Sequence, residues 1–90
     1  MAERSVVVGS RIGLHARPAA LFVKAASAQP VKITIRKGEG PAVDARSILR
    51  VLALGARNGD IVVLEAEGDG AAEALEAVAT VVAEDHDDPA

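Results

Sequence analysis

Gly13-Leu14-His15-Ala16-Arg17-Pro18 joins a strand-like apolar run to a helix-like amphipathic run, and the rest of the chain is organised around this junction. Proline is tolerated in the first turn of a helix because the amide hydrogen that it lacks has no partner there, so Pro18 predicts a helix start. His15 then falls at or next to the helix N-cap. Gly13 permits a tight or positive-φ backbone just before the histidine. The stretch therefore predicts a loop that delivers an imidazole to a helix N-terminus.

The residue types in this stretch suit an anion, and above all a phosphate. A helix N-terminus offers backbone N–H groups and a partial positive charge, and Arg17 adds a planar, permanently charged donor fork. A neutral imidazole nitrogen is a good nucleophile toward a phosphoryl group, and a helix N-terminus disfavours the imidazolium. We therefore expect His15 to carry a phosphoryl group. The alternatives are a surface histidine that follows a glycine loop and, for Arg17, an exposed solubilising charge.

The runs on either side of the stretch have different periodicities. A β-branched run stopped by Gly9 predicts a strand over residues 4–9. Farther along, apolar residues recur at i, i+3, i+4 and i+7, which predicts a helix over residues 16–28. Alternation of apolar and polar residues then predicts a strand over residues 31–36. The first third of the chain thus reads as strand, helix and strand.

Turn and cap signals divide the remainder of the chain. A glycine-rich turn over residues 37–40 predicts a hairpin, and the proline at the start of its second strand, residues 41–44, suggests a sheet edge. Next come a short helix that begins after the N-cap Ser47 and ends at Leu54, with Gly55 as its stop, the turn Asn58-Gly59, and a strand over 60–67. Asp69 is expected to cap the last helix, residues 71–83. The predicted buried stripe of that helix includes Ala72, Leu75, Ala79 and Val82.

The order βαββαβα, with short connections and no internal repeat, favours an open antiparallel sheet covered on one face by helices. We predict an α/β (α+β) two-layer open-faced sandwich with a four-stranded antiparallel sheet and three helices. Residues 1–83 are expected to form one domain. Residues 84–90, which contain four acids and no Lys or Arg, are expected to form a disordered acidic tail.

Composition excludes several classes of function. The 90 residues include no cysteine, which removes disulfides and thiolate chemistry, and no apolar run approaches the roughly 18 residues of a membrane span. The net charge of −3 becomes +1 without the tail acids, and Phe22 is the only aromatic residue, so nucleic-acid binding is not expected. His86 among the tail acids suggests a metal ligand, but a flexible acidic tail is the preferred explanation. A cytoplasmic protein with no metal and no cofactor is expected.

Two stretches of the sequence resemble one known family. The hexapeptide at 13–18, followed by Ala19, Ala20, Phe22 and Val23, resembles the active-site signature of HPr, the histidine-containing phosphocarrier of the bacterial sugar phosphotransferase system. Residues 45–55 resemble the regulatory-serine segment of the same family, at the expected distance downstream. The resemblance runs from about Glu3 to Val82, and it implies the same two-layer sandwich.

The resemblance implies a carrier rather than an enzyme. In the family, enzyme I takes a phosphoryl group from phosphoenolpyruvate and passes it to HPr, which passes it to the IIA component of a sugar permease. By resemblance, Nδ1 of His15 accepts the group, Arg17 stabilises it and Ala16 contributes a backbone N–H. Leu14 either anchors the loop in the core or touches a partner. A monomer is expected.

The resemblance also implies a regulatory site and a docking face. In some relatives the serine that matches Ser47 is phosphorylated by a serine kinase, and the product binds a transcription regulator. Arg50 departs from that branch, which has a small residue there. The implied docking face consists of Ala20, Leu21, Lys24, Ile48, Leu49 and Arg50, although the apolar members, Ile48 above all, are equally explained as core.

Two alternative functions remain open. One is a paralogous carrier in a nitrogen-related or dihydroxyacetone-kinase phosphorelay, with the same chemistry at His15 and a different docking face. The other is a regulatory binding module that acts through Ser47.

Overall fold

The computed structural model describes residues 2–9, 13–14 and 16–84 of the 90-residue chain. Its elements follow the predicted order and are β1 (Ala2–Val7), α1 (Ala16–Ser27), β2 (Ile33–Lys37), β3 (Val43–Asp44), α2 (Ile48–Ala53), β4 (Ile61–Ala66) and α3 (Ala71–Ala83). Several strand limits differ from the prediction. β1 begins at Ala2 because it pairs with β4 as far as Ala66, and β2 begins at Ile33 because its ladder with β4 ends there. The predicted class, an open-faced α+β sandwich, is confirmed.

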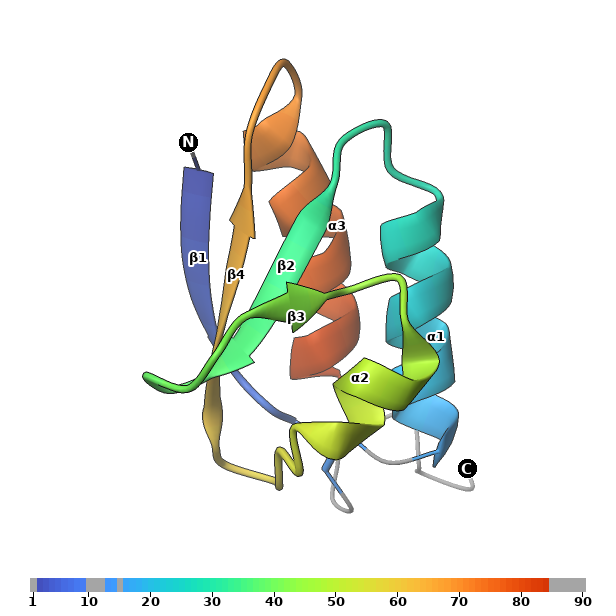
Figure 1. Cartoon of the computed structure of the whole chain (residues 1–90), viewed down its shortest axis with the longest axis vertical. Coiled ribbons are helices and arrows are strands. Elements are labelled where there is room, and N and C mark those ends of the chain that lie inside the picture. Colours follow the sequence, from blue (N-terminus) through green and yellow to red (C-terminus); the bar gives the residue numbers. More distant parts are fainter. Residues whose placement is uncertain (1, 10–12, 15, 85–90) are drawn as a thin grey trace.

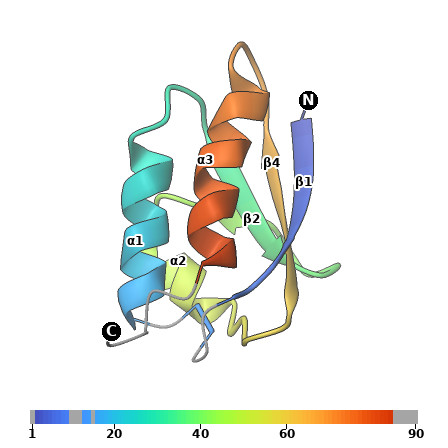
Figure 2. The same ribbon diagram turned by 180° about the vertical axis from the view of Figure 1, so that it is seen from behind.

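The four strands form one antiparallel sheet in the order β1-β4-β2-β3. The helices cover one face of this sheet and leave the other face open (Figure 1, Figure 2). The short strand β3 lies at the sheet edge, as the proline signal predicted. The strand begins at Val43 and not at Pro41 as predicted, so both Pro41 and Ala42 precede it.

The core lies between the sheet and the helices. Alternation in β2 places Ile33 and Ile35 on the covered face, where Ile35 lies opposite Leu64 of β4. Phe22 of α1 is fully buried against the same core. Burying an aliphatic or aromatic side chain of this size contributes about 1.5–3 kcal/mol, so these few large residues fix how the helices sit on the sheet.

Helix α3 corrects two details of the prediction. Its N-cap is Gly70, at φ 82°, and no side chain caps the helix, so the expected cap at Asp69 is wrong by one position. Glu73 instead supplies negative charge in the first turn, which favours the helix dipole. Leu75, Ala79 and Val82 are buried as predicted. Ala72 is exposed, because the helix is rotated so that its buried stripe consists of Ala71, Ala74, Leu75, Val78, Ala79 and Val82.

None of the helices in the described parts of the chain is long and apolar enough to cross a membrane.

Candidate functional site

The start of α1 lies where the sequence predicted it. The helix begins at Ala16, and Pro18 lies in its first turn with its ring buried. Arg17 is exposed, and within the described residues no carboxylate lies within ion-pair distance of its guanidinium. His15, the predicted phosphoryl acceptor, lies outside the described residues. The site is therefore described through the residues before His15, 13–14, and those after it, from Ala16 onward.

The two residues before the histidine are fixed against the segment that follows α2. Gly13 has φ 78°, which confirms the predicted positive-φ backbone. A side-chain methyl at Gly13 would collide with the carbonyl oxygen of Ala56 and would lie 2.8 Å from Cα of Arg57. The amide of Leu14 donates to the carbonyl oxygen of Ala56 at 2.9 Å, and the Leu14 side chain is buried. Of the two roles considered for Leu14, the structure shows core anchoring.

Helices α1 and α2 contact one another, and α2 lies beside the N-terminal end of α1 in both views (Figure 1, Figure 2). Leu49 of α2 is 77% exposed, more than the other exposed large apolar residues of the described chain. Leu52, one helical turn farther along, is 37% exposed and was not singled out from the sequence. Because residues three apart on a helix are neighbours on its surface, the spacing from Leu49 could have indicated that Leu52 lies beside it.

The six predicted docking residues divide into two groups by exposure. Ala20, Lys24, Leu49 and Arg50 are exposed, whereas Leu21 and Ile48 are half-buried. Ile48 packs against the hydrophobic core and is only partly exposed, so it is at least in part a core residue. The exposed members lie on two helices that contact one another.

Helices α1 and α2 carry positively charged side chains and no negatively charged ones. Neither α1 nor α2 contains an aspartate or glutamate. Arg17, Lys24 and Arg50 are exposed there, and none of them has a carboxylate within ion-pair distance in the described part of the chain. Four cations outside these two helices do have carboxylate partners, in the ion pairs Arg4–Glu76, Arg36–Glu65, Lys37–Asp60 and Arg46–Asp44. The unpaired cations of α1 and α2 can therefore attract an anion.

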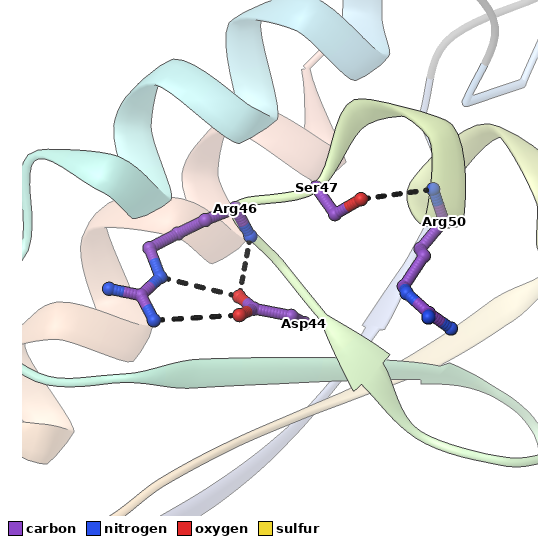
Figure 3. A network of polar contacts seen from close by, with 4 residues as sticks. All are labelled: Asp44, Arg46, Ser47 and Arg50. Atoms are coloured by element: carbon purple, nitrogen blue, oxygen red, sulfur yellow. Dashed lines mark hydrogen bonds and ion pairs between the residues drawn. The ribbon is translucent and has the colours of Figure 1, made fainter.

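Ser47 is the N-cap of α2, as predicted. Its Oγ accepts a hydrogen bond from the amide of Arg50 at 3.4 Å, while the guanidinium of Arg50 extends away without a drawn contact (Figure 3). Just before it, Oδ1 of Asp44 accepts from the backbone amide of Arg46 at 2.9 Å and from Nε of the same residue at 3.3 Å. The backbone hydrogen bond, followed by the side-chain one, lowers the pKa of Asp44 below its ordinary value. The guanidinium of Arg46 therefore has a carboxylate partner, whereas that of Arg50 has none among the residues that the structure describes.

Of the predicted acidic tail, only Glu84 belongs to the described residues. His86 and its acidic neighbours lie outside them, so the metal alternative for the tail stays a sequence-based hypothesis.

The comparisons with known proteins agree with this geometry. The family model of the PTS HPr component phosphorylation site matches residues 2–84. A phosphocarrier protein HPr of Streptomyces coelicolor is 54% identical over 84 residues, which are 93% of this chain and 90% of the relative. The crystal structure of a phosphocarrier protein HPr from Bacillus anthracis has a TM-score of 0.84 at 41% identity, and the match covers 90% of this chain and 95% of that one. A crystal structure of an HPr dimer from Thermoanaerobacter tengcongensis has a TM-score of 0.68 at 39% identity and covers 91% of this chain and 93% of that one.

An open-faced sandwich that matches a phosphorylation-site model over nearly its whole length is a phosphocarrier domain of the phosphotransferase system. The chain belongs to the HPr family.

Proposed function

We propose that the protein accepts a phosphoryl group on His15 from phospho-enzyme I and transfers it to the IIA components of sugar permeases. The observation that carries this proposal is the match of the phosphorylation-site model to residues 2–84, together with a helix that begins directly after His15. A carrier of this kind works in the cytoplasm as a monomer, although a solved relative is a dimer.

The proposed chemistry is a phosphoryl exchange between two imidazoles. Nδ1 of His15 attacks the phosphorus of the donor, a new N–P bond forms, and the N–P bond to the donor histidine breaks with its electron pair on the donor nitrogen. Arg17 meets the phosphoryl oxygens, and Ala16 contributes its backbone N–H. The exposed position of Arg17 supports this role because a guanidinium without an ion-pair partner in the described residues is available to a bound anion. The second transfer, to IIA, is the same exchange in reverse, and it requires mainly positioning and charge stabilisation.

The partners are proposed to dock on the α1–α2 side. In this proposal Leu49, Leu21 and Ala20 supply the apolar contact, and Arg17, Lys24 and Arg50 on the same two helices supply positive charge. A partner with an acidic rim around an apolar contact matches this arrangement. Electrostatic attraction of this type speeds encounter more than it adds affinity, which suits a carrier that must leave each partner quickly.

Two alternatives predict different behaviour. A paralogous carrier of a nitrogen-related or dihydroxyacetone-kinase relay would be phosphorylated on His15 but would not serve the sugar-specific IIA components. A regulatory module acting through Ser47 would need a serine kinase and a transcription regulator, and would not need His15. The N-cap position of Ser47 gives that residue a structural role that requires no kinase.

The test is transfer of labelled phosphate through the whole relay. Radiolabelled phosphoenolpyruvate, magnesium, enzyme I and a sugar-specific IIA component are incubated with the wild-type chain, with His15→Ala or with Ser47→Ala. Label on IIA with the wild type and with Ser47→Ala, but not with His15→Ala, supports the proposal. Label that stops on His15 indicates a paralogous relay, and transfer by His15→Ala contradicts the proposed chemistry.

A further inference from the structure

The turn between α2 and β4, residues 56–60, contacts both ends of the segment that connects β1 with α1. At the first end, the amide of Gly59 donates to the carbonyl oxygen of Val8 at 3.0 Å. The side-chain amide of Asn58 donates to the same oxygen and to the carbonyl oxygen of Gly9, each at 3.4 Å. In return, the amide of Val8 donates to the carbonyl oxygen of Asp60 at 2.9 Å. The start of the connecting segment is therefore held by four hydrogen bonds to one turn.

The other end of the segment is held by the first residue of the same turn. The amide of Leu14 donates to the carbonyl oxygen of Ala56 at 2.9 Å. The backbone of Gly13 approaches Ala56 and Arg57 so closely that no side chain fits between them. One short turn thus fixes both Val8–Gly9 and Gly13–Leu14, and the latter pair immediately precedes His15.

The turn is itself held in shape. Oδ2 of Asp60 accepts from the backbone amide of Arg57 at 2.9 Å, and the amide of Asp60 donates to the carbonyl oxygen of Arg57 at the same distance. Nζ of Lys37 lies 3.5 Å from Oδ2 of Asp60. A turn closed by two reciprocal hydrogen bonds has few alternative conformations, so it can act as a rigid reference for the segment that it holds.

We propose that residues 56–60 form a clamp that sets the position of His15 for phosphoryl transfer, and that Asn58 is a positioning residue within it. This inference rests on the proposed function of His15. Among the described residues, Asn58 is the one whose side chain bridges the carbonyl oxygens of Val8 and Gly9. The side chain is exposed, so its truncation leaves no cavity. Positioning affects the transfer step steeply, since small displacements of a reacting group cost large factors in rate.

The experiment compares two variants of Asn58 with a matched control. Asn58→Ala removes the amide, and Asn58→Asp keeps its shape but places a carboxylate against two carbonyl oxygens. Gln29→Ala is the control, because its side-chain amide also donates to a backbone carbonyl, that of Ala25 at 3.2 Å, at the opposite end of α1. Each protein is phosphorylated by enzyme I over a range of carrier concentrations, and circular dichroism verifies that each is folded.

The clamp predicts a change in kcat and not in KM, because the docking face on α1 and α2 is left intact. For Asn58→Ala we expect kcat to fall about tenfold and KM to stay within about twofold of wild type. The variant loses the side-chain hydrogen bonds to Val8 and Gly9, and a tenfold change matches the free energy of about one such bond. Asn58→Asp is expected to be slower still, and Gln29→Ala to match the wild type. Amide hydrogen exchange at Gly59 and Leu14, a readout that does not depend on activity, is expected to speed up in both Asn58 variants only.

The possible results distinguish failure of the clamp from failure of the proposed phosphoryl transfer. A wild-type chain that enzyme I does not phosphorylate overturns the proposed function, and the positioning role with it. A wild type that is phosphorylated normally, with Asn58→Ala equal to it in kcat, overturns the clamp alone. A raised KM at unchanged kcat also overturns it, because Asn58 would then act in docking.

Discussion

Replacing Gly13 by alanine tests how tightly the loop before His15 is held. Gly13 has φ 78°, in the left-handed region that side chains other than glycine adopt at a cost. Its added methyl would also collide with the carbonyl oxygen of Ala56 and lie 2.8 Å from Cα of Arg57. Both obstacles are backbone atoms, which cannot rotate away as a flexible side chain does. The substitution therefore combines a conformational penalty with a steric one.

The magnitude follows from these two terms. A left-handed alanine costs about 1–2 kcal/mol, and forcing an extra methyl into a close-packed contact costs about 1–3 kcal/mol. The gain from a less flexible unfolded chain returns about 0.4–1 kcal/mol. We expect Gly13→Ala to lower the free energy of unfolding by about 1–5 kcal/mol. For a domain of this size Tm falls by roughly 4–8 °C for each kcal/mol lost.

Two other glycines of the chain allow the conformational cost and the steric cost to be measured separately. Gly38 has φ 55° and open space around the position of a methyl, so Gly38→Ala carries the conformational cost alone. Gly9 has no positive φ, but its methyl would collide with the carbonyl of Ala83, so Gly9→Ala carries the steric cost alone. Urea denaturation of the three variants, at fixed pH, gives the three free energies. If Gly13→Ala is no more destabilising than Gly38→Ala, the close approach of Gly13 to Ala56 is refuted.

Three further predictions concern the cap, the turn and the docking face. Ser47→Ala removes the N-cap acceptor of α2 and is expected to cost about 1 kcal/mol in urea denaturation; a change below about 0.3 kcal/mol would argue against the cap. The hydrogen bond from the backbone amide of Arg57 is the largest cause that lowers the folded-state pKa of Asp60 below 3.8. The stability that Asp60 contributes is therefore present above that value and is lost as the pH falls through the folded-state pKa. Wild type should therefore exceed Asp60→Ala in Tm at pH 7, with the difference shrinking below pH 3.8, and a constant difference down to pH 2 would contradict this account. Leu49→Ala is expected to change the free energy of unfolding by less than about 0.5 kcal/mol, while it raises the KM for phosphorylation by enzyme I about fivefold. The control is Val7→Ala, which removes an exposed apolar side chain from the open face of the sheet and should leave this KM unchanged.

The sequence predicted those features that neighbouring residues determine by themselves. The helix start next to Pro18 follows from the missing amide hydrogen of proline, and the cap at Ser47 follows from a hydroxyl that reaches the third amide beyond it. The covered face of β2 follows from alternation, which has only two possible phases. In each case the decisive interaction lies within a few residues in the chain.

Two kinds of feature could not be predicted in this way. One is the choice between two neighbouring residues that both suit a role, and the other is a contact between segments far apart in the sequence. Asp69 and Gly70 both suit a helix N-terminus, and the loop that leads into α3 selects Gly70 because the backbone there has a positive φ. The partial exposure of Leu52 depends on how α2 packs against the rest of the fold. The sequence identified Asn58 only as a turn residue. Its side-chain hydrogen bond to Val8 joins residues 50 positions apart, so no local sequence pattern could predict it.

The most direct test of the central claim is the intact mass of the protein after incubation with phosphoenolpyruvate, magnesium and enzyme I. The account predicts that the wild type gains one acid-labile phosphoryl group, that fragmentation places the group on His15, and that His15→Ala gains none. A folded wild type that gains no phosphoryl group from a working enzyme I, or a His15→Ala variant that gains one, would contradict the account.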